Sequence, residues 1–363
     1  DIPVVGITGS NGKTVVKEWL YQLLSPEKNV TRSPRSYNSQ IGVPLSVWNL
    51  DERSEVGLFE AGISEPGEME ALQSVIQPTI GVFTCLGDAH QENFTSYEQK
   101  CLEKLKLFKD AKVLVYDMDD ARVVGCVNRS AFKGEYFAWS RQRRDVPLYI
   151  ASVEKREAET VVSYIYKGKE AACSIPFIDE ASLANSVSCL AVCLHLGMSP
   201  ETIAARMAVL EPVAMRLEVK EGRSGCTLIN DSYNSDYNSL DIALDFQQSR
   251  RVEKNLKCTL ILSDILQSGT LPKSLYKKVA DLVRRKKIDR IIGIGRDLKE
   301  YGGAFDIEKE FYLTTDEFIK SPSFKKFKDE LILIKGSRQF HFERISELLE
   351  KKVHETILEV NLD

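Results

Sequence analysis

The chain has 363 residues, of which 43% are hydrophobic and 28% charged, a composition typical of globular proteins. Its 49 Lys and Arg residues and 53 Asp and Glu residues leave a net charge of −4, so it lacks the basic field that attracts nucleic acid. No apolar run approaches the ~20 residues that a membrane span needs. At ~100–200 residues per domain, the length predicts two or three domains.

The eight cysteines are scattered and form no CxxC pair. Cys189 and Cys193 stand four residues apart on a predicted helix, where a buried face is favoured over metal binding. Free thiols are typical of a reducing compartment, and from the sequence we expect no secretory signal peptide. The sequence therefore predicts a cytoplasmic protein.

Strands and helices alternate along most of the chain. Residues 2–8 predict a buried strand, followed by a glycine-containing loop and an amphipathic helix at 13–24. Further strands are predicted at 56–60, 79–84, 112–116, 259–262, 290–294 and 331–335. Further helices are predicted at 66–76, 96–108, 182–196, 200–209, 273–286 and 342–352. This alternation indicates an α/β protein with parallel sheets covered on both faces.

Two parts of the chain do not follow this alternation of strands and helices. Residues 134–178 contain shorter alternating segments, such as 160–166, which predict a β insertion or the edge of a lobe. A helical stretch ends near Pro212 and a new strand pattern begins, so we expect one domain at 1–212 and a second at 213–363. The basic cluster at 284–287 (RRKK) is interpreted as a solvated helix face.

The segment 8–14 (TGSNGKT) follows the first strand and opens a helix. Its glycines allow backbone amides to face a phosphate, and the helix N-terminus adds partial positive charge. Lys13 would reach the β and γ phosphates, and the Thr14 hydroxyl would ligate Mg²⁺. The strict GxxxxGK[ST] spacing fails at Ile7, which leaves a glycine-rich turn with a solvated lysine as the alternative. The predicted phosphate-binding residues are Gly9, Ser10, Asn11, Gly12, Lys13 and Thr14.

This loop variant resembles that of the Mur ligases and folylpolyglutamate synthases rather than that of ordinary P-loop ATPases. Later segments resemble, in the same order, motifs of the Mur ligase family, and especially of its MurF type. They are 38–45 (NSQIGVPL), 59–62 (FEAG) with 67–68 (GE), 87–90 (GDAH) with Phe94 and Ser96, 230–234 (NDSYN) and 335–338 (KGSR). The resemblance implies a central P-loop ATPase domain followed by a Rossmann-like C-terminal domain.

It also implies an ATP-dependent ligase that joins D-Ala-D-Ala to the tripeptide carboxylate of UDP-MurNAc-tripeptide through an acyl phosphate. Enzymes of this type carry an N-terminal UDP-binding domain, and the chain leaves no room for one before residue 8, so we expect a fragment. Residues 358–363 (LEVNLD) resemble the first strand of alanine racemase, which suggests a fused racemase domain; an ordinary terminal strand is the alternative. The alternative functions are those of a folylpolyglutamate-type ligase, another Mur ligase or a non-catalytic nucleotide-binding scaffold.

By resemblance, Thr14, Glu60 and His90 would hold two Mg²⁺ ions, which bring phosphate and carboxylate together despite their like charge. A carboxylate that ends an apolar strand, as Glu60 does, needs a cation, so a buried salt bridge is its alternative role. For His90 the alternative is a surface histidine.

Lys104 lies fourteen residues after His90, where Mur ligases carry a lysine that CO₂ converts to an anionic carbamate ligand. The resemblance therefore makes Lys13, His90 and Lys104 the catalytic residues. The usual A-K-x-E pattern is replaced at 103–106 (EKLK), so Lys100 and Lys106 remain alternatives, as do solvated lysines.

The resemblance places further residues around the nucleotide and substrate. Asn185, in 181–185 (ASLAN) where the family reads HNxxN, would contact adenine. Arg216 and Asp231 would border the nucleotide, and Asp264 lies in a segment similar to a GDM motif. The residues expected to contact substrate are Asn38, Asn234, Ser337 and Arg338.

Overall fold

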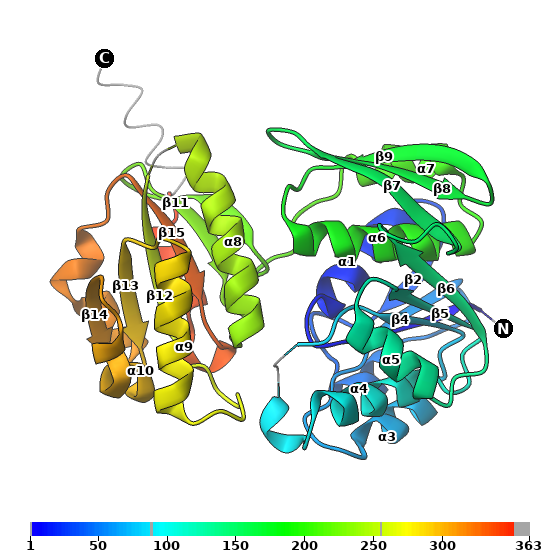
Figure 1. The fold of residues 1–363 in the computed structure, drawn as a ribbon, viewed down its shortest axis with the longest axis horizontal. Coiled ribbons are helices and arrows are strands. Elements are labelled where there is room, and N and C mark those ends of the chain that lie inside the picture. The colour runs from blue at the N-terminus through cyan, green and yellow to red at the C-terminus, as the bar shows by residue number, and fades with distance from the viewer. Residues whose placement is uncertain (1, 88–89, 255, 352–363) are drawn as a thin grey trace. The chain divides into compact units, whose positions relative to one another are not determined.

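The computed structural model describes residues 2–87, 90–254 and 256–351. The chain divides into two compact units, Asp1–Glu211 (unit 1) and Pro212–Asp363 (unit 2), and each is described by itself (Figure 1). Both units are α/β, which confirms the predicted fold class. Within the described ranges, no helix has the length and apolar character that a membrane crossing requires.

Unit 1 is built on one nine-stranded sheet with the order β2-β3-β1-β4-β5-β6-β7-β8-β9. Strands β2 to β7 pair in parallel, whereas β7, β8 and β9 form an antiparallel meander at one edge. This meander accounts for most of the β-rich segment predicted at 134–178. The strands are β1 Val4–Thr8, β2 Val30–Arg32, β3 Val56–Glu60, β4 Ile80–Phe83, β5 Val113–Asp117, β6 Glu135–Ser140, β7 Leu148–Lys155, β8 Thr160–Tyr166 and β9 Lys169–Ile175.

Helices cover both faces of the parallel part of this sheet. On one face, α1 (Lys13–Leu24) packs against α6 (Glu180–His195), because its Val16, Leu20 and Leu23 recur at helical spacing and are buried. On the opposite face lie α3, α4 and α5 (Figure 1). The remaining helices are α2 Gly42–Val47, α3 Glu68–Ile76, α4 Tyr97–Leu105, α5 Ala121–Arg129 and α7 Pro200–Met207, with the 3-10 turns η1 Gln91–Asn93 and η2 Lys106–Phe108.

Unit 2 has a six-stranded sheet with the order β10-β11-β15-β12-β13-β14, in which only the β10–β11 pair is antiparallel. The central strand β15 is wholly buried because apolar clusters cover both faces of the sheet. The strands are β10 Glu218–Glu221, β11 Thr227–Asp231, β12 Lys257–Ser263, β13 Arg290–Ile294, β14 Glu308–Tyr312 and β15 Glu330–Lys335. The helices are α8 Tyr237–Lys254, α9 Pro272–Arg285, α10 Arg296–Tyr301, α11 Thr315–Lys320 and α12 Glu343–Leu349, with 3-10 turns η3 Gly302–Ala304, η4 Pro322–Lys325 and η5 Arg338–Phe340.

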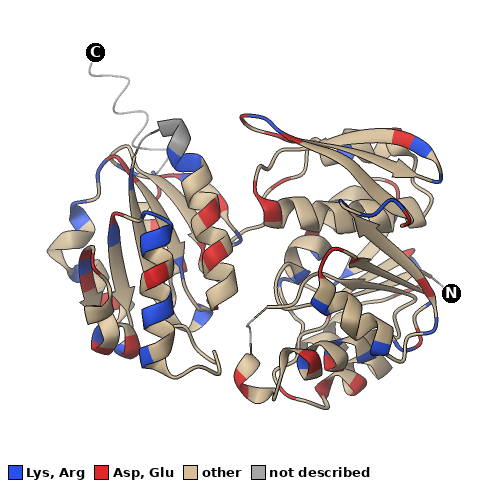
Figure 2. Ribbon diagram, viewed as in Figure 1, with Lys and Arg blue, Asp and Glu red and all other residues tan. Residues whose placement is uncertain are grey.

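Two residues of the basic cluster at 284–287 form ion pairs with acidic side chains. Arg284 pairs with Asp281 at 3.3 Å, and Lys286 pairs with Asp241 at 2.8 Å and also with Asp245. Basic and acidic residues are interspersed along α8 and α9 (Figure 2). The cluster is thus part of a mixed-charge helix surface. The racemase-like segment predicted at 358–363 lies outside the described residues.

Candidate active site

The loop between β1 and α1 depends on two glycines. Gly9 has φ 145° and Gly12 has φ 86°, conformations that L-residues rarely adopt. A Cβ on Gly9 would lie 2.0 Å from Thr84 Oγ1, and a Cβ on Gly12 would lie 2.4 Å from Asn185 Oδ1. Thr84, which follows β4, and Asn185, on α6, therefore enclose the loop from two sides. Asn185, predicted to contact adenine, here lies against the phosphate loop itself.

Hydrogen bonds fix this loop to the segment after β4. Ser10 N donates to Cys85 O at 2.8 Å, and the Ser10 hydroxyl donates to Gly87 O at 3.1 Å while accepting from Gly87 N at 2.8 Å. Within the described residues, no side chain caps the N-terminus of α1. The first amides of a helix have no partners inside the helix and carry partial positive charge. The loop can therefore bind an anion such as a phosphate.

The ammonium group of Lys13 lies over this loop. Lys13 Nζ donates to the carbonyl oxygens of Gly9 at 2.8 Å and Ser10 at 3.2 Å. The lysine is thus held by the backbone that surrounds the expected phosphate position. Its charge and the helix N-terminus act on the same point, which favours a polyphosphate ligand.

Glu60 ends β3 at the carboxyl edge of the sheet, paired in register with Ile7 of β1. It is fully buried. Thr14 Oγ1 donates to Glu60 Oε2 at 3.0 Å, Asn38 Nδ2 donates to the same oxygen at 3.3 Å, and Lys17 Nζ lies 3.2 Å from Oε1. The structure thus brings Thr14, Asn38 and Glu60 together. Glu60 also forms a buried salt bridge with Lys17, which is the alternative role predicted from the sequence.

These atoms fit a divalent cation. Mg²⁺ prefers oxygen ligands and is commonly bound by one or two carboxylates together with substrate phosphates. Glu60 Oε2 and Thr14 Oγ1 are such oxygens, and they lie at the start of the helix that follows the phosphate loop. Among the described residues, no three His, Cys, Asp or Glu side chains converge on one point, so phosphate oxygens or water would complete the coordination shell.

A group of buried lysines lies close to the phosphate loop. Lys104, on α4, is 3% exposed, and burial, together with the positive charges of Lys13 and Lys100, holds its pKa well below the usual value. Lys100 is also buried and donates a hydrogen bond to Gly87 O. A lysine with a lowered pKa is neutral over more of the pH range, and the neutral amine is the form that reacts with CO₂.

The structure distinguishes Lys104 from Lys106. Lys106 is 41% exposed and pairs with Glu103 at 2.8 Å and with Glu70 at 3.3 Å. The hydrogen bond that Lys106 donates to Glu103 raises the pKa of Lys106, so its amine stays charged. Burial and charge environment therefore favour Lys104 over Lys106 as the reactive amine.

Other residues of the motif that begins at Gly87 have structural roles. Phe94 is buried in the core of unit 1, and the Ser96 hydroxyl accepts from Gln99 N at 3.0 Å and so caps α4, the helix that carries Lys104. His90 has φ 56° and immediately precedes η1, and it follows residues 88 and 89, which lie outside the described ranges. Its role as a metal ligand stays a prediction.

In unit 2 the predicted residues meet at the carboxyl ends of two neighbouring strands. Strand β11 pairs with β15 so that Asp231 lies opposite Lys335, and Lys335 Nζ binds Asp231 Oδ2 at 2.8 Å. Lys335 also donates to the carbonyl oxygen of Asn234. Arg338 N donates to Tyr233 O at 3.3 Å, which ties the two segments that follow these strands. Lys335 itself was not among the predicted site residues.

Three further residues of unit 2 have defined contacts. The Arg216 guanidinium lies 4.2 Å from the centroid of the Tyr233 ring. Ser337 N donates to Ser263 Oγ at 3.0 Å. Asp264 accepts from the backbone amides of Asp297 at 3.1 Å and Leu298 at 2.8 Å, at the start of α10. The Asp264 carboxylate therefore stabilises this helix N-terminus.

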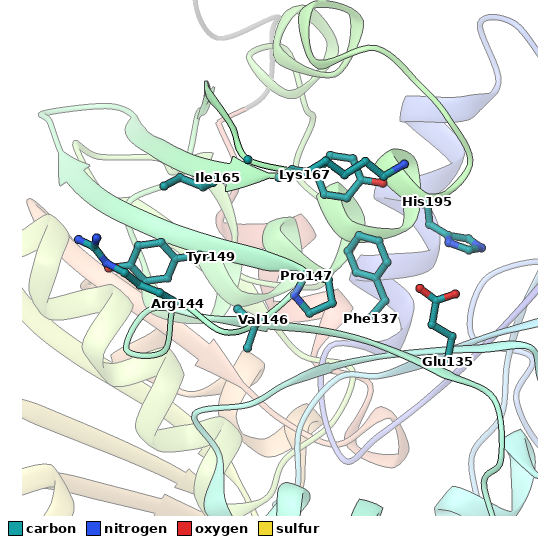
Figure 3. A pocket seen from close by; sticks show the side chains of 11 residues that line it. Glu135, Phe137, Arg144, Val146, Pro147, Tyr149, Ile165, Lys167 and His195 are labelled. Carbon is teal, nitrogen blue, oxygen red and sulfur yellow. The ribbon is translucent and has the colours of Figure 1, made fainter.

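Unit 1 also has a pocket of about 710 Å³. Figure 3 shows the side chains that line it. The pocket opens where β6 and β7 diverge, and its lining includes Phe137, Tyr149 and His195. His195 and Asn185 are both on α6, and ten residues of helix span about 15 Å. None of the predicted site residues lines this pocket.

Comparisons with known proteins identify a family for the sequence and similar folds among solved structures. A sequence model of the Mur ligase middle domain matches residues 7–193. The UDP-N-acetylmuramoyl-tripeptide–D-alanyl-D-alanine ligase of Bacillus subtilis (strain 168) is 28% identical over 353 residues, which cover 94% of this chain and 74% of that protein. MurF from Acinetobacter baumannii has a similar fold, with a TM-score of 0.81 at 21% identity, over 96% of this chain and 77% of that one. MurF ligase from Thermotoga maritima, solved with ADP, gives a TM-score of 0.80 at 22% identity, over 98% and 81%.

Proposed function

Since this chain belongs to the Mur ligase family of ATP-dependent ligases, we propose that it joins D-Ala-D-Ala to the tripeptide carboxylate of UDP-MurNAc-tripeptide in peptidoglycan precursor synthesis. Unit 1 would bind ATP and unit 2 would be the C-terminal domain. The observation that carries this choice of substrate is the meeting of residues 230–234 and 335–338 at one edge of the unit 2 sheet. These are the segments that resemble MurF in particular.

The phosphate loop would hold ATP. The amides at the start of α1 and the Lys13 ammonium would bind its β and γ phosphates. Thr14 and Glu60 would hold Mg²⁺, with His90 as a ligand of a second ion. When bound, Mg²⁺ would neutralise phosphate charge, so that an anionic carboxylate can approach. Asn185 and Arg216, with Asp231, are proposed to border the nucleotide.

We propose that Lys104 reacts with CO₂. Its neutral amine attacks the carbon of CO₂, a C–N bond forms, and one proton leaves to solvent. The product is a carbamate, whose two oxygens share one negative charge, and oxygens of this kind are the ligands that Mg²⁺ prefers. The burial and lowered pKa of Lys104 support this assignment, because both increase the fraction of neutral amine.

The ligation itself would take two steps. An oxygen of the tripeptide carboxylate attacks the γ-phosphorus, the bond to ADP breaks, and an acyl phosphate forms. The amine of D-Ala-D-Ala then attacks the acyl carbon, loses a proton, and displaces inorganic phosphate. Lys13 would stabilise the charge that develops on the phosphoryl group. Asn38, Asn234, Ser337 and Arg338 are proposed to contact the two substrates.

Ligation assays with defined substrates test this proposal. The natural polypeptide that contains this chain is incubated with ATP, Mg²⁺, UDP-MurNAc-tripeptide and one amine, and phosphate release and product mass are measured. D-Ala-D-Ala is expected to support turnover, whereas glutamate and single alanines are not. Turnover with a single amino acid would point to a sister Mur ligase or a folylpolyglutamate-type enzyme. No phosphate release with any pair would point to a non-catalytic scaffold.

A further inference from the structure

Lys17 is a buried residue to which the proposed reaction assigns no role. It lies on α1, one helical turn after Thr14, and is fully buried. Its Nζ lies 3.2 Å from Glu60 Oε1 and 3.0 Å from Glu18 Oε1, and donates to the carbonyl oxygen of Ser33 at 2.7 Å and to that of Arg35. An ammonium group has three N–H donors, so these acceptors satisfy it fully.

The two oxygens of Glu60 have different partners. Oε1 faces Lys17, whereas Oε2 accepts from Thr14 and from Asn38. Lys17 therefore fixes the rotation of the carboxylate, with Oε2 toward the start of α1. Burying a carboxylate is also costly unless a cation lies next to it, and Lys17 supplies one whether or not a metal is bound.

Lys17 also holds the segment that surrounds this carboxylate. The carbonyl groups of Ser33 and Arg35 follow β2, and Arg35 has φ 49°, in the left-handed region that L-residues seldom adopt. The same segment carries Ser36, whose Oγ lies 3.0 Å from Thr14 Oγ1, and Asn38. One ammonium group thus links α1, the end of β3 and the segment that supplies the neighbours of Thr14.

We propose that Lys17 is a positioning residue for the divalent-cation site: by holding Glu60 Oε1 and residues 33–38, it presents Oε2 and the Thr14 hydroxyl to the metal. This inference rests on the proposed function, in which a divalent cation binds with the nucleotide at Glu60. Hydrogen-bonding partners of metal-binding carboxylates orient the ligand, and their removal typically weakens metal binding about 10- to 100-fold.

The test measures Mn²⁺ binding to the chain in the presence of ADP, by the electron paramagnetic resonance signal of free Mn²⁺. The variants are Lys17→Met, Glu60→Gln and the double variant, with Glu18→Gln as a control that leaves the Lys17–Glu60 pair in place. Lys17→Met is expected to weaken Mn²⁺ binding about 10- to 100-fold. ADP affinity in EDTA, which does not depend on the metal, is expected to be unchanged in every variant.

The double variant separates positioning from a general effect on the fold. If Lys17 acts through Glu60, Lys17→Met weakens Mn²⁺ binding much less in the Glu60→Gln background than in the wild type, and only the contribution of residues 33–38 is left. Should Lys17→Met fail to fold, Lys17→Gln, which keeps two N–H donors but no charge, takes its place. Wild-type Mn²⁺ affinity in the Lys17 variant, or an equal loss in both backgrounds, would overturn the inference. A wild-type chain that binds no Mn²⁺ with ADP would overturn it together with the proposed metal site, whereas failed ligation with D-Ala-D-Ala would affect only the proposed function.

Discussion

Lys104→Met should stabilise the folded protein while abolishing its ligase activity. Lys104 is 3% exposed, and within the described part of the chain its Nζ makes no hydrogen bond or ion pair. The side chains whose positive charge lowers its pKa are Lys13 and Lys100, and methionine fills a similar volume without a polar group. In CO₂-free buffer the substitution therefore removes an unfavourable buried amine.

The expected gain follows from the burial of this group. A buried polar group that lacks a compensating hydrogen bond costs about 1–3 kcal/mol in proteins. Unit 1 comprises Asp1–Glu211, and in a domain of this size each kcal/mol shifts the melting temperature by about 2–4 °C. We therefore expect the melting temperature of unit 1 to rise by roughly 2–12 °C at neutral pH.

The gain should depend on pH. Burial lowers the pKa of Lys104 in the folded protein below 10.5, its ordinary value. Between the lowered pKa and 10.5 the unfolded chain binds more protons than the folded one, so wild-type stability rises with pH in this window. The advantage of Lys104→Met is therefore largest below the window, and the part of it that comes from the buried charge disappears as the pH approaches 10.5.

Calorimetry of the wild type and three variants, in CO₂-free buffer across this pH range, measures the effect. Lys106→Met removes the cation that pairs with Glu103, whose side chain is only 6% exposed, and should therefore destabilise the fold by about 1–3 kcal/mol. Lys100→Met removes the donor to Gly87 O and should stabilise less than Lys104→Met. With ¹³C-bicarbonate, a carbamate resonance is expected on the wild type and not on Lys104→Met. A destabilised Lys104→Met, or one that ligates normally, would refute this account.

The remaining predictions concern the phosphate loop and unit 2. ATP with Mg²⁺ at 100 times its Kd should add about 2.7 kcal/mol to wild-type stability, and Lys13→Ala should lose most of this shift in a thermal melt; an undiminished shift would contradict the phosphate assignment. Gly12→Ala places a Cβ 2.4 Å from Asn185 Oδ1 at φ 86° and should cost about 1–3 kcal/mol in urea unfolding, whereas wild-type stability would show that the loop relaxes freely. Lys335→Met leaves Asp231 buried without its cation and should cost unit 2 about 3–5 kcal/mol; adding Asp231→Asn should recover much of this loss, and no recovery would argue against the pair.

Elements with local signals could be predicted closely from the sequence. The apolar pattern and the preceding glycines place α1 at the predicted 13–24, and β3 and β13 have the predicted bounds. Helix α8, with eighteen residues, was not predicted. Its Gln247 occupies a core position, where the side-chain amide donates to the carbonyl oxygens of Thr259 at 3.0 Å and Leu331 at 2.8 Å. A polar residue on the buried face weakens the helical pattern, and its partners are distant in sequence.

The candidate site also contains residues that local sequence identifies and residues whose partners are distant in sequence. The residues of the phosphate loop are adjacent in sequence, so their chemistry could be read directly. Lys17 and Lys335 could not be assigned in this way, because their acidic partners, Glu60 and Asp231, lie on elements that are distant in sequence. One signal was available for Lys17: it precedes Leu20 by three residues and therefore lies on the apolar face of α1. A lysine on such a face predicts a buried acid, although not which one.

Unit 1 contains buried charge around Glu60 and around Lys104. These two places differ in the sign of the charge that would stabilise them further. Glu60 already has a cation, because Lys17 neutralises it within the fold. The cations that act on Lys104 are the neighbouring lysines Lys13 and Lys100, so this side of the site favours anions. ATP phosphates at the loop and a carbamate at Lys104 would both supply negative charge there. Lys17 already neutralises the charge of Glu60 without a metal. The affinity for a divalent cation is therefore highest once those anions are present, which favours its binding together with the nucleotide.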